Sequence, residues 1–330
     1  MSSHDFARRL QAAIVRHVGA PGTLYDLQRL TGGANRTTWS FDAEIGAARR
    51  PFILQLATEI VDPIAHLTAH LNSHELARLM IAAGKAGVPA PRVYGTLEPS
   101  DGLGEGYIAE CVAGETLGPR IVRDERYAAA RAVMAAQCGR ILAAIHRVEL
   151  TDLGFLMSVD PAGQVAAHRQ VVDHFGYRLP ALEWGLRWAE ENIPRSSRRT
   201  LVHGDFRTGN LIVGDEGIRS VLDWELAQIG DPMQDLGWLC VKTWRFGGAG
   251  AVGGFGSRED LFAAYERASG TAVEPAHVRF WEAWGNVQWA IDCLRLGTRG
   301  IEERGIERSA IGRRIEEPLW DLLNLIEGRE

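Results

Sequence analysis

Residues 201–235 read LVHGDFRTGNLIVGDEGIRSVLDWELAQIGDPMQD, and this stretch decides how the 330-residue chain is interpreted. Two short apolar runs, 211–213 and 218–222, flank the turn sequence Gly-Asp-Glu-Gly at 214–217. Short apolar runs joined by a tight glycine-containing turn predict a two-stranded hairpin. The polar residues that border the two runs then come together at the open end of this hairpin.

Three of these polar residues have the chemistry of a catalytic site. Counting back from the turn pairs Leu211 with Ser220, so Asn210 and Asp223 lie side by side, at about the 5 Å spacing of neighbouring strands. An amide oxygen and a carboxylate at that spacing can hold one hard cation such as Mg²⁺ between them. Asp205, one short loop upstream, then stands beside the cation without being obliged to ligate it, which is the position of a base.

The order of these residues matches a specific reaction. A hydroxyl that attacks a magnesium-bound triphosphate needs one carboxylate to orient it or accept its proton, and an amide and a carboxylate to hold the metal. His203, Asp205, Asn210 and Asp223 supply the order H-x-D-x-x-x-x-N, hairpin, D. The segment resembles the phosphotransferase family that includes aminoglycoside phosphotransferases and choline kinases, whose catalytic segment reads H-G-D-x-x-x-x-N followed by I/L-D-W/F-E.

This resemblance implies a fold and a set of roles. The implied fold class is α+β, a bilobal protein-kinase-like fold with a small antiparallel-sheet N-lobe carrying one helix and a larger, mainly helical C-lobe that carries the catalytic hairpin. The implied cofactors are ATP (or GTP) and Mg²⁺. Asp205 would be the catalytic base, Asn210 and Asp223 the magnesium ligands, and residues 230–232 with Asp235 structural elements.

Two further segments refine the resemblance. Residues 231–238 (DPMQDLGW) and 284–290 (WGNVQWA) are similar to the kinase domains of acyl-CoA-dehydrogenase-associated proteins and their stand-alone bacterial relatives. Most of the ten tryptophans lie from Trp184 onward, and we expect these large rings to pack in the core of the second lobe.

The length of the chain is consistent with two lobes, because a single hydrophobic core stops growing at roughly 250–300 residues. An apolar residue recurs every four positions from Phe6 to Val18, which predicts an opening helix. Strands are predicted at 24–30, 37–44, 51–57, 92–97 and 106–112. We therefore place an N-terminal nucleotide-binding lobe at 1–112 and a catalytic and substrate-binding lobe at 113–330.

One helix is expected between the third and fourth strands. Asp62-Pro63 has the form of an N-cap followed by proline in the first turn, so we predict that the helix opens there and stops near Gly84. This helix would carry Glu75, the position at which the family has the partner of a strand cation.

Nucleotide contacts are predicted in the first lobe. Gly32, Gly33, Asn35 and Arg36 lie between two predicted strands, as a flap whose backbone amides approach phosphates, although a plain hairpin turn fits the glycine pair as well. The segment from Glu110 to Val112 resembles the family's hinge, so its backbone groups would meet the adenine edge.

The third strand departs from the family. Its sequence, PFILQLA, has Gln55 where the family has a basic residue that grips the α and β phosphates. Gln55 brings no charge, so Glu75 lacks its usual partner and the phosphate contact must come from Arg36, from Arg49 or Arg50, or from nowhere.

Composition limits the partners and the location. The net charge of −6 gives no basic footprint for nucleic acid, and the cysteines show no Cys-x-x-Cys spacing. The first ten residues contain no apolar signal segment, and nowhere do about 18 apolar residues run together. We expect a cytoplasmic protein without a membrane or nucleic-acid partner; the oligomeric state stays open.

The favoured function is a kinase that acts on a small hydroxylated metabolite, such as a sugar, an amino alcohol or a hydroxyacyl compound. A catalytically silent nucleotide-binding protein of the same fold is an alternative because of Gln55. A metal-dependent hydrolase or an acyl-compound-binding protein also remains open. Residues 247–256 contain six glycines, which favours either a mobile cover over the acceptor site or a slack connector.

Overall fold

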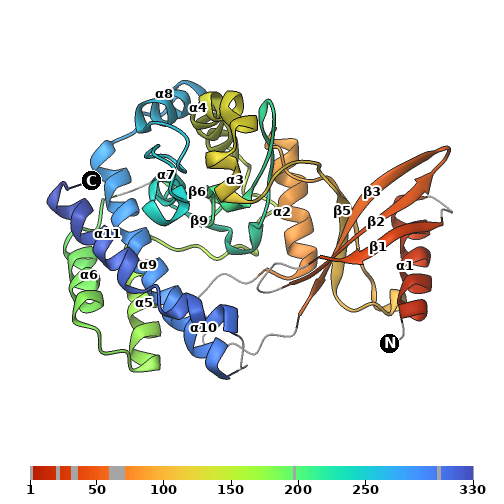
Figure 1. Ribbon diagram of the computed structural model, residues 1–330, viewed down its shortest axis with the longest axis horizontal. Coiled ribbons are helices and arrows are strands. Elements are labelled where there is room, and N and C mark those ends of the chain that lie inside the picture. Colours follow the sequence, from red (N-terminus) through yellow and green to blue (C-terminus); the bar gives the residue numbers. More distant parts are fainter. Residues whose placement is uncertain are drawn as a thin grey trace.

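The computed structural model describes residues 3–19, 23–30, 36–58, 71–195, 198–302 and 306–329. Strands and helices separate into two regions, with an antiparallel sheet at one end of the molecule and a larger body of helices at the other (Figure 1). The α+β class and the bilobal arrangement predicted from the sequence are confirmed.

The sheet of the first region has the order β1-β2-β3-β5-β4. Its strands are β1 (Leu24–Arg29), β2 (Arg36–Ile45), β3 (Ala48–Ala57), β4 (Val93–Thr96) and β5 (Gly106–Glu110), close to the five predicted strands. Helix α1 (Ser3–Val18) covers one face of this sheet, because its four-residue repeat buries Phe6, Leu10 and Ile14 against Phe41 and Phe52. These contacts form a separate apolar core for the first lobe.

The other face of the sheet carries polar groups at one end. Thr38 of β2 pairs with Gln55 of β3, and Gln55 pairs with Tyr107 of β5. Paired residues of an antiparallel sheet point to the same face, and so do residues two apart along a strand. Arg36 therefore lies on the same face as Gln55 and Tyr107, opposite to the face that packs on α1.

Helix α2 (Ser73–Lys85) begins later than predicted. The expected start at Asp62-Pro63 lies outside the described residues, and the helix that carries Glu75 is capped by Asn72. The buried residues of α2, among them Leu76 and Leu79, belong to the apolar core of the second lobe. The predicted lobe boundary at residue 112 thus agrees with the end of the sheet at Glu110. The large apolar core, in contrast, contains residues from both sides of that boundary.

The second lobe is mainly helical. Its helices are α3 (Gly118–Arg123), α4 (Ala128–Ile145), α5 (Pro161–Phe175), α6 (Pro180–Glu191), α7 (Met233–Cys240), α8 (Arg258–Ser269), α9 (Pro275–Glu302), α10 (Ile306–Gly312) and α11 (Glu316–Glu327). Its short 3-10 turns are η3 (Glu125–Tyr127), η4 (Thr208–Asn210), η5 (Trp224–Leu226) and η6 (Lys242–Arg245), while η2 (Pro99–Asp101) lies in the first lobe. Trp281 and Trp284 are fully buried, as expected of core tryptophans, whereas Trp184 and Trp320 are exposed.

One helical stretch in the described part of the chain, Glu125–Ile145, is long and apolar enough to cross a membrane by length and composition alone. Of its apolar 18-residue window, 56% is buried inside the protein. Gly139 lies so close to α8 that a Cβ would approach the carbonyl oxygen of Leu261 to 2.5 Å. This is the packing of a core helix.

Two small antiparallel pairs carry the catalytic sequence. β6 (Thr200–Val202) pairs with β9 (Gln228–Gly230), and β7 (Leu211–Gly214) pairs with β8 (Gly217–Val221) in the predicted hairpin. The hairpin register differs from the predicted one, because Leu211 faces Val221 and not Ser220. A bulge next to Ile212 inserts an extra residue, which counting back from the turn cannot detect.

The glycine-rich segment 247–256 is folded back on itself through backbone bridges such as Gly250 to Gly254. It packs against the catalytic loop, where the Thr208 hydroxyl donates to the Gly253 carbonyl at 2.8 Å. This packing contradicts the prediction of a slack connector, whereas the mobile cover over the acceptor site stays a prediction. The reason is steric: glycines favour flexibility in an isolated chain, but they also allow backbones to approach more closely than any Cβ permits, as between Gly248 and Gly254.

Candidate active site

Asp205 lies in the loop between β6 and η4, and its buried carboxylate is held by three donors. Oδ1 accepts from Nε of Arg207 at 2.9 Å and from Nε1 of Trp238 at 2.8 Å. Oδ2 accepts from Nδ2 of Asn210 at 2.6 Å. Hydrogen bonds to an ionised group are short and directional, so the carboxylate is fixed in one orientation.

Asn210 and Asp223 meet at the open end of the hairpin, as predicted. The amide of Leu222 donates to the carbonyl of Asn210 at 2.8 Å, which places Asp223 next to it. The side-chain nitrogen of Asn210 is committed to Asp205, since it also donates to the Asp205 carbonyl at 2.9 Å. The side-chain oxygen of Asn210 is then the atom that can face a cation.

The carboxyl group of Asp223 is in an unusual environment. Its backbone has φ +66°, a left-handed conformation that Asp tolerates better than most residues. Burial, together with the carboxylates of Glu225 and Asp205, raises the pKa of Asp223 to about 7, although Arg207 and Arg36 oppose the rise. Negative charge is therefore concentrated where a cation would relieve it.

The donor set at this point fits magnesium. The described residues contain no group of three or more His, Cys, Asp or Glu arranged to hold a metal ion. Magnesium needs fewer protein ligands when it is shared with a nucleotide, because phosphate oxygens and water complete its octahedron. Asn210 and Asp223 suit such a shared ion, whereas they are too few for an ion held by protein alone.

His203 connects the two halves of the site. Its Nδ1 accepts from the backbone amide of Asp205 at 3.2 Å, so Nε2 carries the proton and donates to the Leu222 carbonyl at 3.0 Å. Burial lowers the pKa of His203, which favours this neutral form. The His203 ring thus connects the backbone of Asp205 to Leu222, the residue that precedes Asp223.

Asp235 holds the backbone of the same loop, at residues 203 and 204. Its two carboxylate oxygens accept from the backbone amides of His203 and Gly204 at 2.9 and 3.0 Å. His146 donates to Asp235 from Nε2 at 3.0 Å, and its other nitrogen contacts the Tyr265 hydroxyl at 2.9 Å. This buried chain reaches from the catalytic loop into α4 and α8, and it supports the structural role implied for Asp235.

Asp231, in the Gly-Asp-Pro segment, also has structural contacts. One oxygen accepts from the Met233 amide at 3.0 Å and the other from His277 and Trp281 at 2.6 and 3.0 Å. Burial alone would raise the pKa of Asp231, but the His277 ring and the other donors hold it below its usual value. The segment thereby joins the start of α7 to α9.

Arg36 is the cation of the first lobe that lies near the catalytic residues. Its guanidinium donates to Ser73 Oγ at 2.8 Å and to the Leu71 carbonyl at 3.0 Å, at the start of α2. Its Nε is buried and has no partner among the described residues. Burial raises the pKa of both Tyr107 and Asp223, and the positive charge of Arg36 opposes each rise, so Arg36 acts electrostatically on groups of both lobes.

The other two arginines considered from the sequence lie at the wrong end of the sheet. Arg49 is next to the β2–β3 turn, where it pairs with Asp26 and with Asp42. It is six residues from Gln55 along β3, or roughly 20 Å at the rise of a strand. Arg50 adjoins Arg49, so neither can replace the missing strand cation, and Arg36 remains.

Gln55 has a partner of its own. The hydroxyl of Tyr107 donates to Gln55 Oε1 at 2.6 Å on the face that looks toward the second lobe. A lysine at position 55 would leave this buried hydroxyl without its acceptor. The departure from the family is therefore a matched pair of residues, and we expect Gln55→Lys to break the hydrogen bond that joins them.

Glu75 is placed differently from the prediction. Its carboxylate accepts from the Asn72 backbone amide at 3.0 Å, and Asn72 accepts in return from the Glu75 amide at 2.9 Å. This capping box occupies Glu75 at the helix start, where it cannot also pair with a cation on β3. The prediction of Glu75 as a nucleotide-site residue is therefore corrected: it is a capping residue.

Two of the three backbone amides in the predicted hinge, residues 110–112, already donate within the protein. The amide of Glu110 donates to the Arg92 carbonyl at 2.8 Å, and the amide of Cys111 to the Pro51 carbonyl at 3.4 Å. Within the described part of the chain, Val112 is the hinge residue whose amide has no such partner. Gly32, Gly33 and Asn35, the predicted flap, lie outside the described residues.

Sequence reasoning missed several residues of the site. Arg207 pairs with Asp205 and stacks on Trp244, with its guanidinium carbon 4.6 Å from the ring centroid. Trp238 donates to Asp205 from α7. Arg207 could have been found from its place two positions after the base, whereas a contact across 33 positions gave no signal in the sequence.

Comparison with known proteins matches this arrangement to a family. Residues 26–281 match the model of the phosphotransferase enzyme family, which covers well over half of the chain and all the predicted catalytic residues, Asp205, Asn210 and Asp223. The chain belongs to the phosphotransferase enzyme family.

Relatives of known sequence include the branch expected from residues 231–238. The chain is 34% identical to mouse acyl-CoA dehydrogenase family member 10 over 186 residues, which is 53% of this chain and 17% of the mouse protein. It is 28% identical to the homoserine kinase of Methylocella silvestris over 163 residues, 44% of this chain and 50% of that enzyme. The chain thus corresponds to a small part of the dehydrogenase-family protein.

Solved structures show the same fold. A Ralstonia eutropha protein likened to aminoglycoside phosphotransferases superposes with a TM-score of 0.74 at 20% identity, over 97% of this chain and 98% of that one. The spectinomycin phosphotransferase APH(9)-Ia, in complex with ADP and spectinomycin, gives 0.63 at 13% identity over 96% and 98%. At these identities the likeness shows the fold alone, and the protein-kinase-like fold predicted from the sequence is confirmed.

Proposed function

We propose that this phosphotransferase is a magnesium-dependent kinase that transfers the γ-phosphoryl group of ATP (or GTP) to a hydroxyl of a small metabolite. The observation that carries this proposal is the carboxylate of Asp205, oriented by three donors and adjacent to Asn210 and Asp223 at the hairpin end. A base and two metal-type ligands on one rigid framework suit in-line transfer to a hydroxyl.

Asp205 orients the acceptor hydroxyl and takes its proton as the bond to phosphorus forms. Arg207 and Trp238 occupy Oδ1, and Asn210 occupies Oδ2, so the remaining lone pairs of the carboxylate have fixed directions. Arg207 also places a positive charge beside the base, where negative charge develops on the transferring group.

Asn210 and Asp223 hold the magnesium ion in this proposal. Held by these two residues, a magnesium ion would supply positive charge that offsets the negative charge of the nucleotide phosphates. The raised pKa of Asp223 indicates a carboxyl group whose ionised form lacks compensation from protein charges. A cation supplies that compensation, which couples nucleotide binding to the ionised form of Asp223.

In this proposal Arg36 and Val112 bind opposite ends of the nucleotide. The guanidinium of Arg36 contacts the phosphates in place of the strand lysine, and the free amide of Val112 meets the adenine edge. Gly32, Gly33 and Asn35 remain proposed as the phosphate flap.

The acceptor is a hydroxylated metabolite, and we favour a hydroxyacyl compound. Relatives named as acyl-CoA dehydrogenase family members support an acyl compound, while a relative named homoserine kinase supports an amino alcohol. We place the protein in the cytoplasm. An ADP-release screen with hydroxyacyl thioesters, amino alcohols and sugars tests this choice. Transfer to an amino alcohol or a sugar but to no hydroxyacyl thioester would refute the hydroxyacyl acceptor, and transfer to none of the three groups would refute the kinase.

A catalytically silent nucleotide-binding protein is the alternative, and the Gln55–Tyr107 pair is the observation that favours it. The two functions differ in one measurement. Magnesium-dependent thermal stabilisation by ATP, together with no ADP release on any acceptor, indicates the silent protein. Stabilisation with acceptor-dependent ADP release indicates the kinase.

A further inference from the structure

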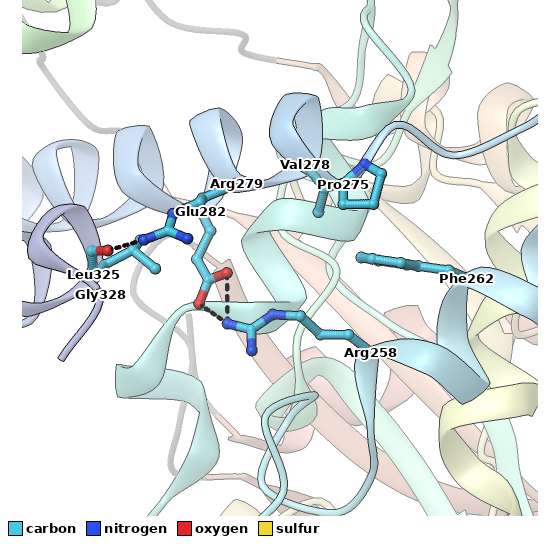
Figure 2. Close-up of a pocket in the computed structure, with 8 residues that line it drawn as sticks. All are labelled: Arg258, Phe262, Pro275, Val278, Arg279, Glu282, Leu325 and Gly328. Atoms are coloured by element: carbon cyan, nitrogen blue, oxygen red, sulfur yellow. Dashed lines mark hydrogen bonds and ion pairs between the residues drawn. The ribbon is translucent and has the colours of Figure 1, made fainter. Parts of the chain in front are cut away.

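A cavity lies in the second lobe, away from the candidate active site, between the start of α8, the first turns of α9 and the end of α11 (Figure 2). Its volume is about 310 Å³, at the lower end of the range for small-molecule sites. None of the residues assigned above to the base, the metal or the nucleotide lines it. We call it the α8–α9 cavity.

One side of the α8–α9 cavity is apolar. Figure 2 shows the ring of Phe262 next to Pro275 and Val278, with Leu325 on the opposite side of the opening. Val278 is buried and Phe262 is half-buried. A hydrocarbon group placed here would be removed from water on more than one side.

The rest of the lining is charged, with two arginines and one glutamate. Nη2 of Arg258 donates to both carboxylate oxygens of Glu282, at 2.8 and 2.9 Å. Arg279 donates to the backbone carbonyl of Leu325 and forms no ion pair within the described part of the chain. Positive charge therefore exceeds negative charge in the cavity by one.

Glu282 forms an ion pair with a second arginine, which does not line the cavity. Nη2 of Arg245 donates to Glu282 Oε1 at 3.2 Å from outside the α8–α9 cavity, and only 3% of Glu282 is exposed. If Arg258 turned toward a ligand, Glu282 would still have a charged partner. The cavity can thus accept another carboxylate without leaving a buried charge unpaired, which would be costly.

We propose that the α8–α9 cavity binds a small amphipathic monocarboxylate. Its carboxylate lies between Arg258 and Arg279, and its hydrocarbon part lies against Phe262 and Pro275. A guanidinium matches a carboxylate with two parallel hydrogen bonds, which an ammonium or hydroxyl ligand cannot provide. A 150 Å³ cavity takes benzene, so this one accommodates roughly ten non-hydrogen atoms.

The net charge of the chain, −6, makes general attraction of anions an inadequate explanation for such binding. The selectivity must come from the local arrangement of the arginines. The site is separate from phosphoryl transfer, so the proposal does not depend on the proposed function.

Calorimetric titration of the full chain with octanoate, octan-1-ol and octylammonium tests the chemistry of the ligand. These probes share one hydrocarbon chain and differ in the head group. We expect saturable binding of octanoate at one site and at least about tenfold weaker binding of the other two. Equal affinity for octanoate and octan-1-ol, or no octanoate binding up to its solubility limit, would overturn the proposal.

Two variants locate the site. Arg279→Gln should weaken octanoate binding by about tenfold or more while leaving the Glu282 network untouched. Arg258→Gln should weaken octanoate binding by a similar factor, but it also removes two hydrogen bonds to Glu282. Arg267→Gln removes the same charge from the exposed end of α8 and should change nothing. If Arg258→Gln does not fold, Arg279→Gln decides, and wild-type affinity in that variant would place the carboxylate elsewhere.

Discussion

Replacement of Arg36 by methionine tests how this protein grips a nucleotide without a lysine on β3. Methionine keeps much of the apolar stem of arginine but removes the charge. A charged hydrogen bond to phosphate contributes about 1.5–3 kcal/mol, so the dissociation constant for Mg-ATP should rise by about 10- to 150-fold. Adenosine has no phosphate, and its affinity should stay within about twofold, since a twofold change is less than about 0.5 kcal/mol.

The same substitution has a structural cost that must be separated from the loss of the phosphate contact. Arg36 also donates to Ser73 Oγ and to the Leu71 carbonyl, and losing these bonds should lower the free energy of unfolding by about 1–3 kcal/mol. Calorimetric titration should therefore be done well below the melting temperature of the variant, where the variant is folded.

Arg49→Met is the matched control, because it removes the same charge from the same sheet at the far end of β3. It should leave both affinities unchanged. The reasoning is refuted if Arg36→Met weakens ATP and adenosine equally, if ATP affinity does not change, or if Arg49→Met has the same effect.

The remaining predictions concern catalysis, the glycine-rich segment and pH. Asp205→Asn should lower turnover by roughly 10²-fold or more with nearly unchanged nucleotide affinity, whereas Asp223→Asn should weaken magnesium-dependent nucleotide binding; steady-state kinetics and titration separate the two. Gly253→Ala puts a Cβ about 2.6 Å from Thr208 Oγ1 at φ +55°, so urea unfolding should show a loss of about 1–3 kcal/mol. Burial lowers the pKa of His168 to about 4, so the unfolded chain binds the proton first as the pH falls. The free energy of unfolding should therefore be at its full value above about pH 6.5 and should decrease toward pH 4 by up to about 3 kcal/mol. His168→Phe should flatten this pH dependence.

Controls for these predictions come from the same chain. Gly270→Ala has the same type of backbone strain, φ +67°, but meets nothing within 4 Å, so it should cost less than Gly253→Ala. His174, exposed near the end of α5, serves as the control for His168, and His174→Phe should leave the pH dependence unchanged. Reversed phenotypes for Asp205→Asn and Asp223→Asn would show that the base and the metal ligand have been exchanged.

Much of the catalytic arrangement could be predicted because its information is local. Asp205, Asn210 and Asp223 lie within 19 positions. A hairpin connects Asn210 to Asp223, and the sequence of its turn, residues 214–217, is recognisable from residue type. Short loops leave the chain few ways to separate such residues, so spacing and residue type together fix which side chains meet. The opening helix was predictable for a similar reason, because a four-residue apolar repeat has one buried face.

Local signals can also mislead when two of them compete. Asp62-Pro63 has the form of a helix start, yet the helix that carries Glu75 begins at Ser73, after the capping box of Asn72 and Glu75. That box was visible in the sequence as N-x-x-E, and it would have excluded Glu75 as the partner of a strand cation.

The tertiary structure alone decided which distant side chains reach the site. The register of β2 against β3 separates Arg36 from Arg49 and selects one of the candidate cations. Trp238 reaches Asp205 across 33 positions, and His146 reaches Asp235 across 89. A sequence specifies the residues and the local bends of the chain, but contacts between separate elements depend on how sheets pair and helices pack, and a single bulge or a close glycine contact changes which side chains meet.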